Sequence, residues 1–157
     1  WEAVLKDEIG KRTGRYQGEN LYHLGVGADA YALAYPGIPL VLNPKSILHV
    51  TVNVWDDSAG RKINAEPKTF TVFEPFSAET MVGTGLTRSK EQQMAALAGN
   101  AARQINDWLV ENKAWFSPEA VAARMILGRD PNAPATAQAS AQAAAPAAVQ
   151  AGSVPGN

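Results

Sequence analysis

The clearest strand signal in this sequence is ILHVTVNVW, residues 47–55, in which Leu and Val alternate with His, Thr and Asn. Successive side chains of a strand point to opposite faces, so this alternation predicts one buried face and one polar face. The turn residues of Asp56–Gly60 follow, and a second strand region carrying Ile63, Phe70, Val72 and Phe73 is expected to return antiparallel. Pro67 cannot donate to a ladder, which places part of this return at an edge or a bulge.

Residues 21–35 alternate in the same way but change phase part-way along. The apolar positions are first Tyr22, Leu24, Val26 and Ala28, and then Tyr31, Leu33 and Tyr35. A bulge near Gly27 accounts for the change of phase. A further short strand is expected at residues 80–84, which would bring the sheet to four strands.

Helical spacing appears at both ends of the strand-rich region. Trp1, Leu5 and Ile9 recur every four residues, which predicts an amphipathic opening helix that fades at Gly10 and Gly14. A longer helix is predicted after Ser89, because Ser89 and Gln92 form a capping box ahead of an apolar stripe. The stripe consists of Met94, Leu97, Ala98, Ala101, Ile105, Trp108 and Leu109. We expect it to lie against the sheet, with Ile105 and Trp108 burying the largest area. A shorter helix begins at Ser117 and Pro118 and stops at Gly128.

Length and composition limit the class of protein. The 157 residues carry 14 Lys plus Arg against 15 Asp plus Glu, and 46% are hydrophobic, which is enough for one packed domain. The sequence has no basic cluster of the kind that binds nucleic acid and no run of about 20 apolar residues that would cross a bilayer. The absence of cysteine excludes disulfides, thiolate zinc sites and a cysteine nucleophile within this sequence.

These patterns predict one α+β domain over residues 1–128, in which a small antiparallel sheet of three to four strands packs against a long C-terminal helix and an N-terminal helix. Residues 129–157 form an Ala/Pro-rich C-terminal tail, in which eleven residues from Asp130 onward are Ala and none is Lys, Arg, Glu or aromatic. Such a segment buries too little apolar surface to fold alone. It is either a flexible tail or a strap that gains order along a neighbouring subunit.

A glycine-rich turn precedes the long helix and is a candidate anion-binding site. It contains Gly83, Gly85, Arg88, Ser89 and Lys90, and backbone N–H groups at a helix N-terminus attract phosphate or carboxylate groups. The spacing matches neither the P-loop nor the dinucleotide-binding pattern. The other interpretation is a plain strand-to-helix turn that caps the helix.

The remaining polar residues do not form a recognisable catalytic or metal-binding pattern. His23 and His49 each stand alone in a strand, without a carboxylate at ligand spacing. Asp56–Gly60 lacks the alternating oxygen ligands of a calcium loop and is interpreted as a hairpin turn. The sequence contains no Gly-x-Ser-x-Gly motif, the nucleophile elbow of serine hydrolases. We therefore predict no catalytic residues, no metal site, no cofactor and no enzymatic activity.

Aromatic residues exceed what one core face requires, which favours a protein contact surface. We expect this surface to include Trp55, Trp115 and Phe116, and to continue into the tail through Pro131, Pro134 and Pro146. Aromatic side chains supply much of the affinity at protein interfaces.

The Trp-Glu start of an amphipathic helix, the small antiparallel sheet and the Ala-rich helix from Ser89 to Trp115 together resemble small bacterial envelope lipoproteins. These are the lipopolysaccharide-assembly accessory lipoprotein and the auxiliary lipoproteins of ABC-type transport systems. The resemblance covers residues 1–116 and rests on the order of elements, so it carries over no functional residue. It implies a periplasmic or outer-membrane-associated, non-enzymatic component of a larger machine.

The sequence therefore predicts a structural or accessory subunit of a cell-envelope assembly. Its partners would be proteins, in a homo- or hetero-oligomer, and would not include nucleic acid. The alternative function is a small-ligand or anion-binding module that uses the turn from Gly83 to Lys90.

Overall fold

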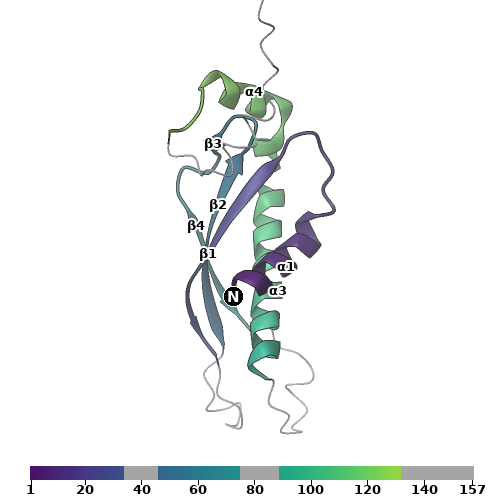
Figure 1. The fold of residues 1–157 in the computed structure, drawn as a ribbon, viewed down its shortest axis with the longest axis vertical. Helices are drawn as coiled ribbons and strands as arrows, with labels where there is room; N and C mark the ends of the chain where they lie inside the picture. Colours follow the sequence, from purple (N-terminus) through teal and green to yellow (C-terminus); the bar gives the residue numbers. More distant parts are fainter. Residues whose placement is uncertain (34–45, 75–88, 132–157) are drawn as a thin grey trace, which may run out of the picture.

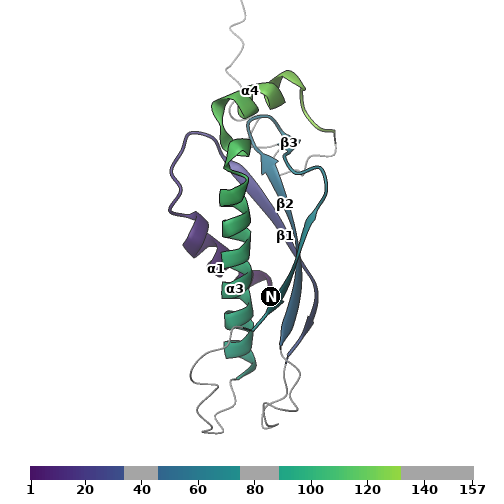
Figure 2. The ribbon, with the colours of Figure 1, turned by 180° about the vertical axis from the view of Figure 1, so that it is seen from behind.

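The computed structural model describes residues 1–33, 46–74 and 89–131. The elements follow in the order α1 (Glu2–Thr13), β1 (Tyr22–Ala32), β2 (Ile47–Asp56), β3 (Arg61–Lys62), β4 (Lys68–Phe73), α3 (Lys90–Glu111), the 3-10 helix η1 (Lys113–Phe116) and α4 (Pro118–Ile126). Helices α1 and α3 lie on one face of the sheet, and α4 crosses one end of the molecule (Figures 1 and 2). The predicted α+β class is confirmed.

The sheet has four antiparallel strands arranged around β2. Strand β1 pairs with one edge of β2, while β3 and β4 pair in succession with its other edge. The predicted alternation of β2 is confirmed, because Leu48, Val50, Val52 and Val54 are fully buried and the residues between them are only half-buried. Because the side chains of a strand alternate between its two faces, the Leu and Val side chains of β2 all face the helices.

The core lies between the inner face of the sheet and the two helices. Leu5 and Ile9 of α1 pack against α3. The apolar stripe of α3 was predicted from the sequence, and four of its residues, Leu97, Ala98, Ala101 and Ile105, are fully buried. The alanines allow α3 to approach both α1 and the sheet closely. Trp108 is partly buried and packs its ring edge-on against Phe70, with ring centroids 5.9 Å apart.

The boundaries of the helices follow local rules in most places. Ser89 and Gln92 form the predicted capping box, with Gln92 N–H donating to Ser89 Oγ at 3.2 Å and Ser89 N–H donating to Gln92 Oε1 at 2.9 Å. Helix α1 continues through Gly10 and ends at Thr13, so only the predicted boundary at Gly14 is confirmed. Burial of Leu5 and Ile9, in the two turns before Gly10, outweighs the helix cost of about 1 kcal/mol that glycine carries.

The structure refines one prediction about the strands and corrects another. The bulge predicted near Gly27 is present in β1 and lies two residues farther on, at Asp29, since the pairing register shifts between Ala28 and Ala30. A hydrogen bond from the Thr51 hydroxyl to the Asp29 carboxylate stabilises the bulge there. The return strand is also divided in two, because Ile63–Pro67 leaves the ladder between β3 and β4.

Asn64 replaces the missing ladder within this interruption. Its Oδ1 accepts from Val54 N–H at 2.8 Å, and its Nδ2 donates to the Val52 carbonyl at 3.2 Å. The buried backbone of β2 thus stays hydrogen-bonded where Pro67 and its neighbours leave the strand. The strand predicted at residues 80–84 lies outside the described residues.

Candidate interaction surface at the α4 end

The turn after β2 is built around Asp56, whose side chain is fully buried. Asp56 Oδ1 accepts from the Ser58 hydroxyl at 2.7 Å and from the Ala59 N–H at 3.1 Å. Its other oxygen, Oδ2, accepts from Arg124 Nε at 2.8 Å. A carboxylate can be buried at this position because three donors replace its hydration.

The pair between Asp56 and Arg124 fastens α4 to the sheet. The side chain of Arg124 is 13% exposed and that of Asp56 is 0% exposed, so water screens their attraction little. Val121 lies one turn before Arg124 on the same helix face and is also buried. Helix α4 is therefore attached through one ion pair and one apolar side chain.

A second set of contacts holds the end of α4 and the residues after it. Arg61 Nη1 donates to the carbonyls of Leu127, at 3.3 Å, and Gly128, at 2.7 Å. The Asp130 N–H donates to the Gly60 carbonyl at 3.1 Å. Gly60 and Gly128 have φ values of 58° and 74°, a region that favours glycine, and Gly128 ends α4 as the sequence predicted.

The local signals for α4 are also those the sequence predicted. Ser117 accepts from Ala120 N–H at 3.3 Å, and Pro118 is the first helical residue. The pKa of Glu119 is lowered, because its carboxylate accepts hydrogen bonds from its own backbone N–H and from Ser117. Negative charge is favoured there by the orphan N–H groups of the first turn.

Beneath α4, aromatic rings connect the 3-10 helix to the domain. Phe116 packs edge-on against Tyr22, with centroids 4.8 Å apart, and Trp115 packs edge-on against Trp108 at 5.4 Å. The rings of Trp115 and Phe116 are thus half-buried by neighbours in the same chain. Trp55 is half-buried on the outer face of the sheet, opposite Lys62 and His23.

Burial raises the pKa of Tyr22, and the negative charge of Asp56 raises it further. Asn20 and Arg124, which lie near the hydroxyl, oppose this rise but do not cancel it. Ionised tyrosine is thus disfavoured at this position, beside the attachment point of α4.

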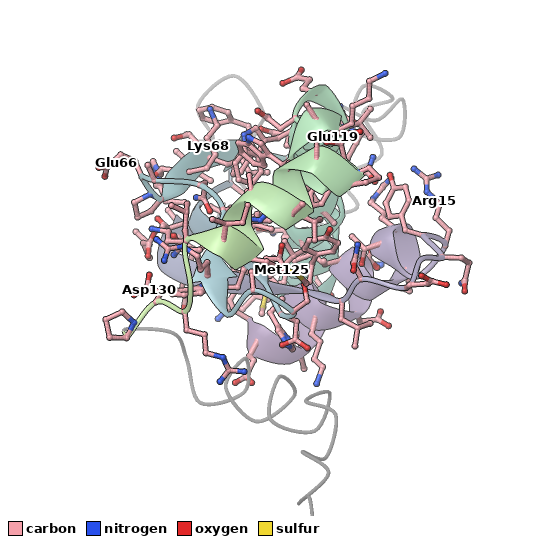
Figure 3. The ribbon with its side chains drawn as sticks, turned by 90° about the horizontal axis from the view of Figure 1, so that it is seen from above. Arg15, Glu66, Lys68, Glu119, Met125 and Asp130 are labelled. Carbon is pink, nitrogen blue, oxygen red and sulfur yellow. The ribbon has the colours of Figure 1, made fainter. Side chains whose placement is uncertain are left out.

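The outer side of α4 is apolar and exposed. Met125 is 52% exposed, Ile126 86% and Leu127 68%, and we call these three consecutive residues the apolar tip. Figure 3 looks onto this end and shows α4 crossing it, with Met125 on the helix and Asp130 where the chain continues beyond it. Leu21, which is 63% exposed, belongs to the same end, because its carbonyl accepts from Asp57 N–H in the turn that carries α4.

The structure places the other predicted site residues as follows. In the anion-binding turn, Gly83, Gly85 and Arg88 lie outside the described residues, while Ser89 is engaged in the capping box and Lys90 is the exposed first residue of α3. Within the tail, Pro131 is exposed, and Pro134 and Pro146 are outside the described ranges. The anion site and the aromatic interface therefore stay predictions.

The two histidines contact separate partners. His23 Nε2 lies 2.9 Å from Asp57 Oδ1, and His49 Nδ1 lies 3.1 Å from the Thr71 hydroxyl. Over residues 1–33, 46–74 and 89–131, no group of three His, Asp or Glu side chains is close enough to hold one metal ion. None of the helices in those ranges combines the length and the apolar character that a membrane span needs.

Sequence reasoning missed the link between Asp56 and Arg124, which are 68 residues apart. A signal for it was present in each element. Asp56 continues the even-numbered phase of β2 that buries Leu48 to Val54, and Arg124 lies one turn after the apolar Val121. A charged residue on the buried face of a strand and another on the buried face of a helix together indicate an ion pair, because a buried charge needs a partner of opposite charge.

Comparisons with known proteins give one structural likeness. No family model and no curated protein matches this sequence. The chain is similar to a crystal structure described as "a putative lipoprotein from Caulobacter crescentus CB15", with 15% identity and a TM-score of 0.41. The match covers 74% of this chain and 85% of that one.

Proposed function

We propose that this protein is a non-enzymatic accessory subunit of a cell-envelope assembly, and that it binds a neighbouring protein through the apolar tip and the tail that follows it. The observation that carries this proposal is the exposure of Met125, Ile126 and Leu127 on a helix that is firmly attached. The order of elements that resembles envelope lipoproteins, helix, small antiparallel sheet and Ala-rich helix, supports the envelope location.

The attachment of α4 supports a binding role. Its start is capped by Ser117, its last turn is held by Asp56 through Arg124, and the carbonyls that follow it are held by Arg61. A helix of nine residues would be unstable in water without such contacts. The contacts therefore fix in place a helix whose end carries three large apolar residues that add little to the core, and a preorganised surface lowers the entropy cost of binding.

The apolar tip differs from the scattered apolar residues of an ordinary protein surface because its three exposed residues are consecutive. Scattered apolar residues are normal on a protein surface, but three consecutive large ones at a helix end form a patch that water solvates poorly. The chain continues from this point into the tail, beyond Asp130 and Pro131. A partner subunit that covers the tip would therefore also lie next to the described start of the tail, Arg129 to Pro131, which supports the proposed strap.

The proposal is tested with substitutions that change the surface and leave the core alone. Ile126→Glu and Leu127→Glu place charge on the tip, and Ala95→Glu is the matched control, on an exposed position of α3 in the half of that helix farther from α4. Each variant is expressed in the native host, and the size of the detergent-solubilised assembly is measured by native mass spectrometry.

We expect the unaltered chain and Ala95→Glu to appear in a complex with a second protein. The two tip variants should be recovered without the second protein, with unchanged circular dichroism. If the tip variants stay in the complex, or if no heteromeric complex forms, the proposal is wrong. Deleting residues 132–157 tests the strap separately, since unchanged assembly would leave the tip alone as the contact.

A further inference from the structure

The two edges of the sheet differ in how well they are protected. Strand β4 is only six residues long, is preceded by Pro67, and carries Lys68 with its ammonium group 5.7 Å from the centroid of the Phe70 ring. Asn100 of α3 donates to the Phe73 carbonyl at 2.8 Å, at the far end of the strand. Short length, proline, lysine and an occupied carbonyl all prevent a second chain from pairing with an edge.

Strand β1 has fewer of these protections. It is 11 residues long, it contains no Lys, Arg, Glu or Pro, and Asp29 is its one carboxylate. Across the described part of the chain, all backbone pairing of β1 is with β2, and no hydrogen bond reaches its outer edge. Unpaired N–H and C=O groups along such an edge favour the addition of another strand.

The bulge limits where a strand can add. At Asp29 one extra residue interrupts the ladder, and its carboxylate binds Thr51. Residues beyond the bulge have changed face, so a regular strand cannot stay in register across it. The open part of the edge is therefore residues 22–28.

We infer that residues 22–28 pair antiparallel with the same residues of a second copy of this chain, about a twofold axis at Gly25. In this register Tyr22 lies opposite Ala28, His23 opposite Gly27, and Leu24 opposite Val26. Each pair joins residues of the same face, because 22, 24, 26 and 28 all lie opposite inward-facing positions of β2.

The occupant is a second copy because the segment is complementary to itself. Two of the three pairs match a large side chain with a small one, and Leu24 and Val26 meet as an apolar pair next to the core. No like charges face each other, since Asp29 lies beyond the paired residues. A twofold axis perpendicular to the sheet keeps α1 and α3 of both copies on one face, which gives a closed, symmetric dimer.

Seven paired residues make a small interface, so the dimer is expected to be weak and to depend on concentration. This inference does not depend on the proposed function, because the apolar tip lies on α4 and the paired residues lie on β1. Substitutions on the tip should leave the dimer intact, and substitutions at Gly25 should leave the contact with the envelope partner intact.

A cysteine at the axis tests the register directly, because the chain has no cysteine of its own. Residues directly opposite each other in an antiparallel pair have Cα atoms about 4.5–5.5 Å apart, within the range a disulfide requires. A Cβ on Gly25 would lie 3.9 Å from its nearest neighbours, Asn53 Cβ and O, so Gly25→Cys fits. Gly18→Cys is the control, with nothing within 4 Å of its Cβ.

Under mild oxidation of the full chain, we expect Gly25→Cys to form a covalent dimer at least about tenfold faster than Gly18→Cys, as proximity predicts. Sedimentation velocity over a concentration series should show dimer for the unaltered chain and for Gly18→Lys. Gly25→Lys should stay monomeric, because it places two ammonium groups opposite each other at the axis. Circular dichroism verifies that each variant is folded.

Two outcomes would overturn the inference. One is equal cross-linking of the two cysteine variants. The other is a monomer at every concentration, which would leave the edge to a strand from a different protein.

Discussion

Helices α3 and α4 are attached to the same sheet by opposite means. Helix α3 packs an apolar stripe against the core, with Leu97, Ala98, Ala101 and Ile105 fully buried. Helix α4 buries one apolar side chain, Val121, and is otherwise held by charge, through Asp56 with Arg124 and through Arg61 with the carbonyls at its end. Apolar attachment removes apolar side chains from the surface, whereas polar attachment leaves those of α4 free to bind another molecule.

The difference also separates stability from function. The stripe of α3 contributes to the core on which the whole domain depends, so its loss affects every element. The contacts that hold α4 all lie at one end of the molecule. Changes there should loosen α4 locally and leave the sheet and α3 folded. Four predictions test this distinction, beginning with the largest effect.

Ile105→Ala is expected to lower the free energy of unfolding of the whole domain by about 2–5 kcal/mol, because it leaves a cavity where a fully buried side chain was. Urea unfolding followed by circular dichroism measures the loss, and hydrogen exchange should rise in the sheet and in α3 together. A loss below about 1 kcal/mol would show that the stripe of α3 is not the main attachment.

Arg124→Leu is expected to release α4 with a smaller effect on the rest of the domain. Removing one partner of a buried ion pair costs about 3–5 kcal/mol while the other charge stays buried. Detachment of α4 exposes Asp56 to water and limits that cost. Hydrogen exchange should therefore increase over residues 117–127, with the sheet protected as before, and equal loss of protection in both regions would contradict the distinction.

Ser117→Ala removes the cap of α4, and Ser89→Ala removes the matching cap of α3. Each substitution costs its helix about 1 kcal/mol. Because α3 has a large apolar stripe and α4 does not, the loss should appear as increased exchange in α4 but hardly at all in the middle of α3. Amide exchange of the two variants under identical conditions makes the comparison.

Tyr22→Phe is expected to have the smallest effect at neutral pH and a visible effect in alkali. The pKa of Tyr22 is raised by burial and by Asp56, so the unfolded chain ionises first as pH increases. The contribution of Tyr22 is fully present below pH 10 and is lost as pH rises toward the folded-state pKa.

The variant should lose less stability than the unaltered chain above pH 10. Urea midpoints measured at several alkaline pH values, with the unaltered chain as reference, make the comparison. Identical alkaline profiles of the two proteins would show that Tyr22 is not packed beside Phe116 and Asp56 as described.

Most elements of the fold were predictable because their signals are local. The alternation in residues 47–55, the capping box at Ser89 and the Ser117-Pro118 start each depend on a few neighbouring residues, and each prediction is confirmed. The errors fall where distant residues decide the outcome. The bulge lies at Asp29, where the Thr51 hydroxyl donates to its carboxylate. The return strand is interrupted at Asn64, whose side chain hydrogen-bonds to the backbone of β2.

The candidate surfaces show the same limit. The interface predicted at Trp115 and Phe116 stays a prediction, and the structure adds that the rings of both residues pack against Trp108 and Tyr22 of the same chain while remaining half-exposed. Met125, Ile126 and Leu127 of the tip are among the exposed apolar residues, and no pattern in the sequence predicted their exposure. They are exposed because of the direction in which α4 lies across the end of the domain.

The order of residues along the chain established the α+β class, the buried face of β2, the stripe of α3 and the capped ends of the helices, because periodicity and capping act over a few neighbouring residues. Only the assembled fold decided that Asp56 meets Arg124, that the tip is exposed, and that β1 pairs with β2 alone among the described strands. Those features depend on pairings between segments far apart in the chain, and the free energy of such pairings is set by geometry that no local pattern contains.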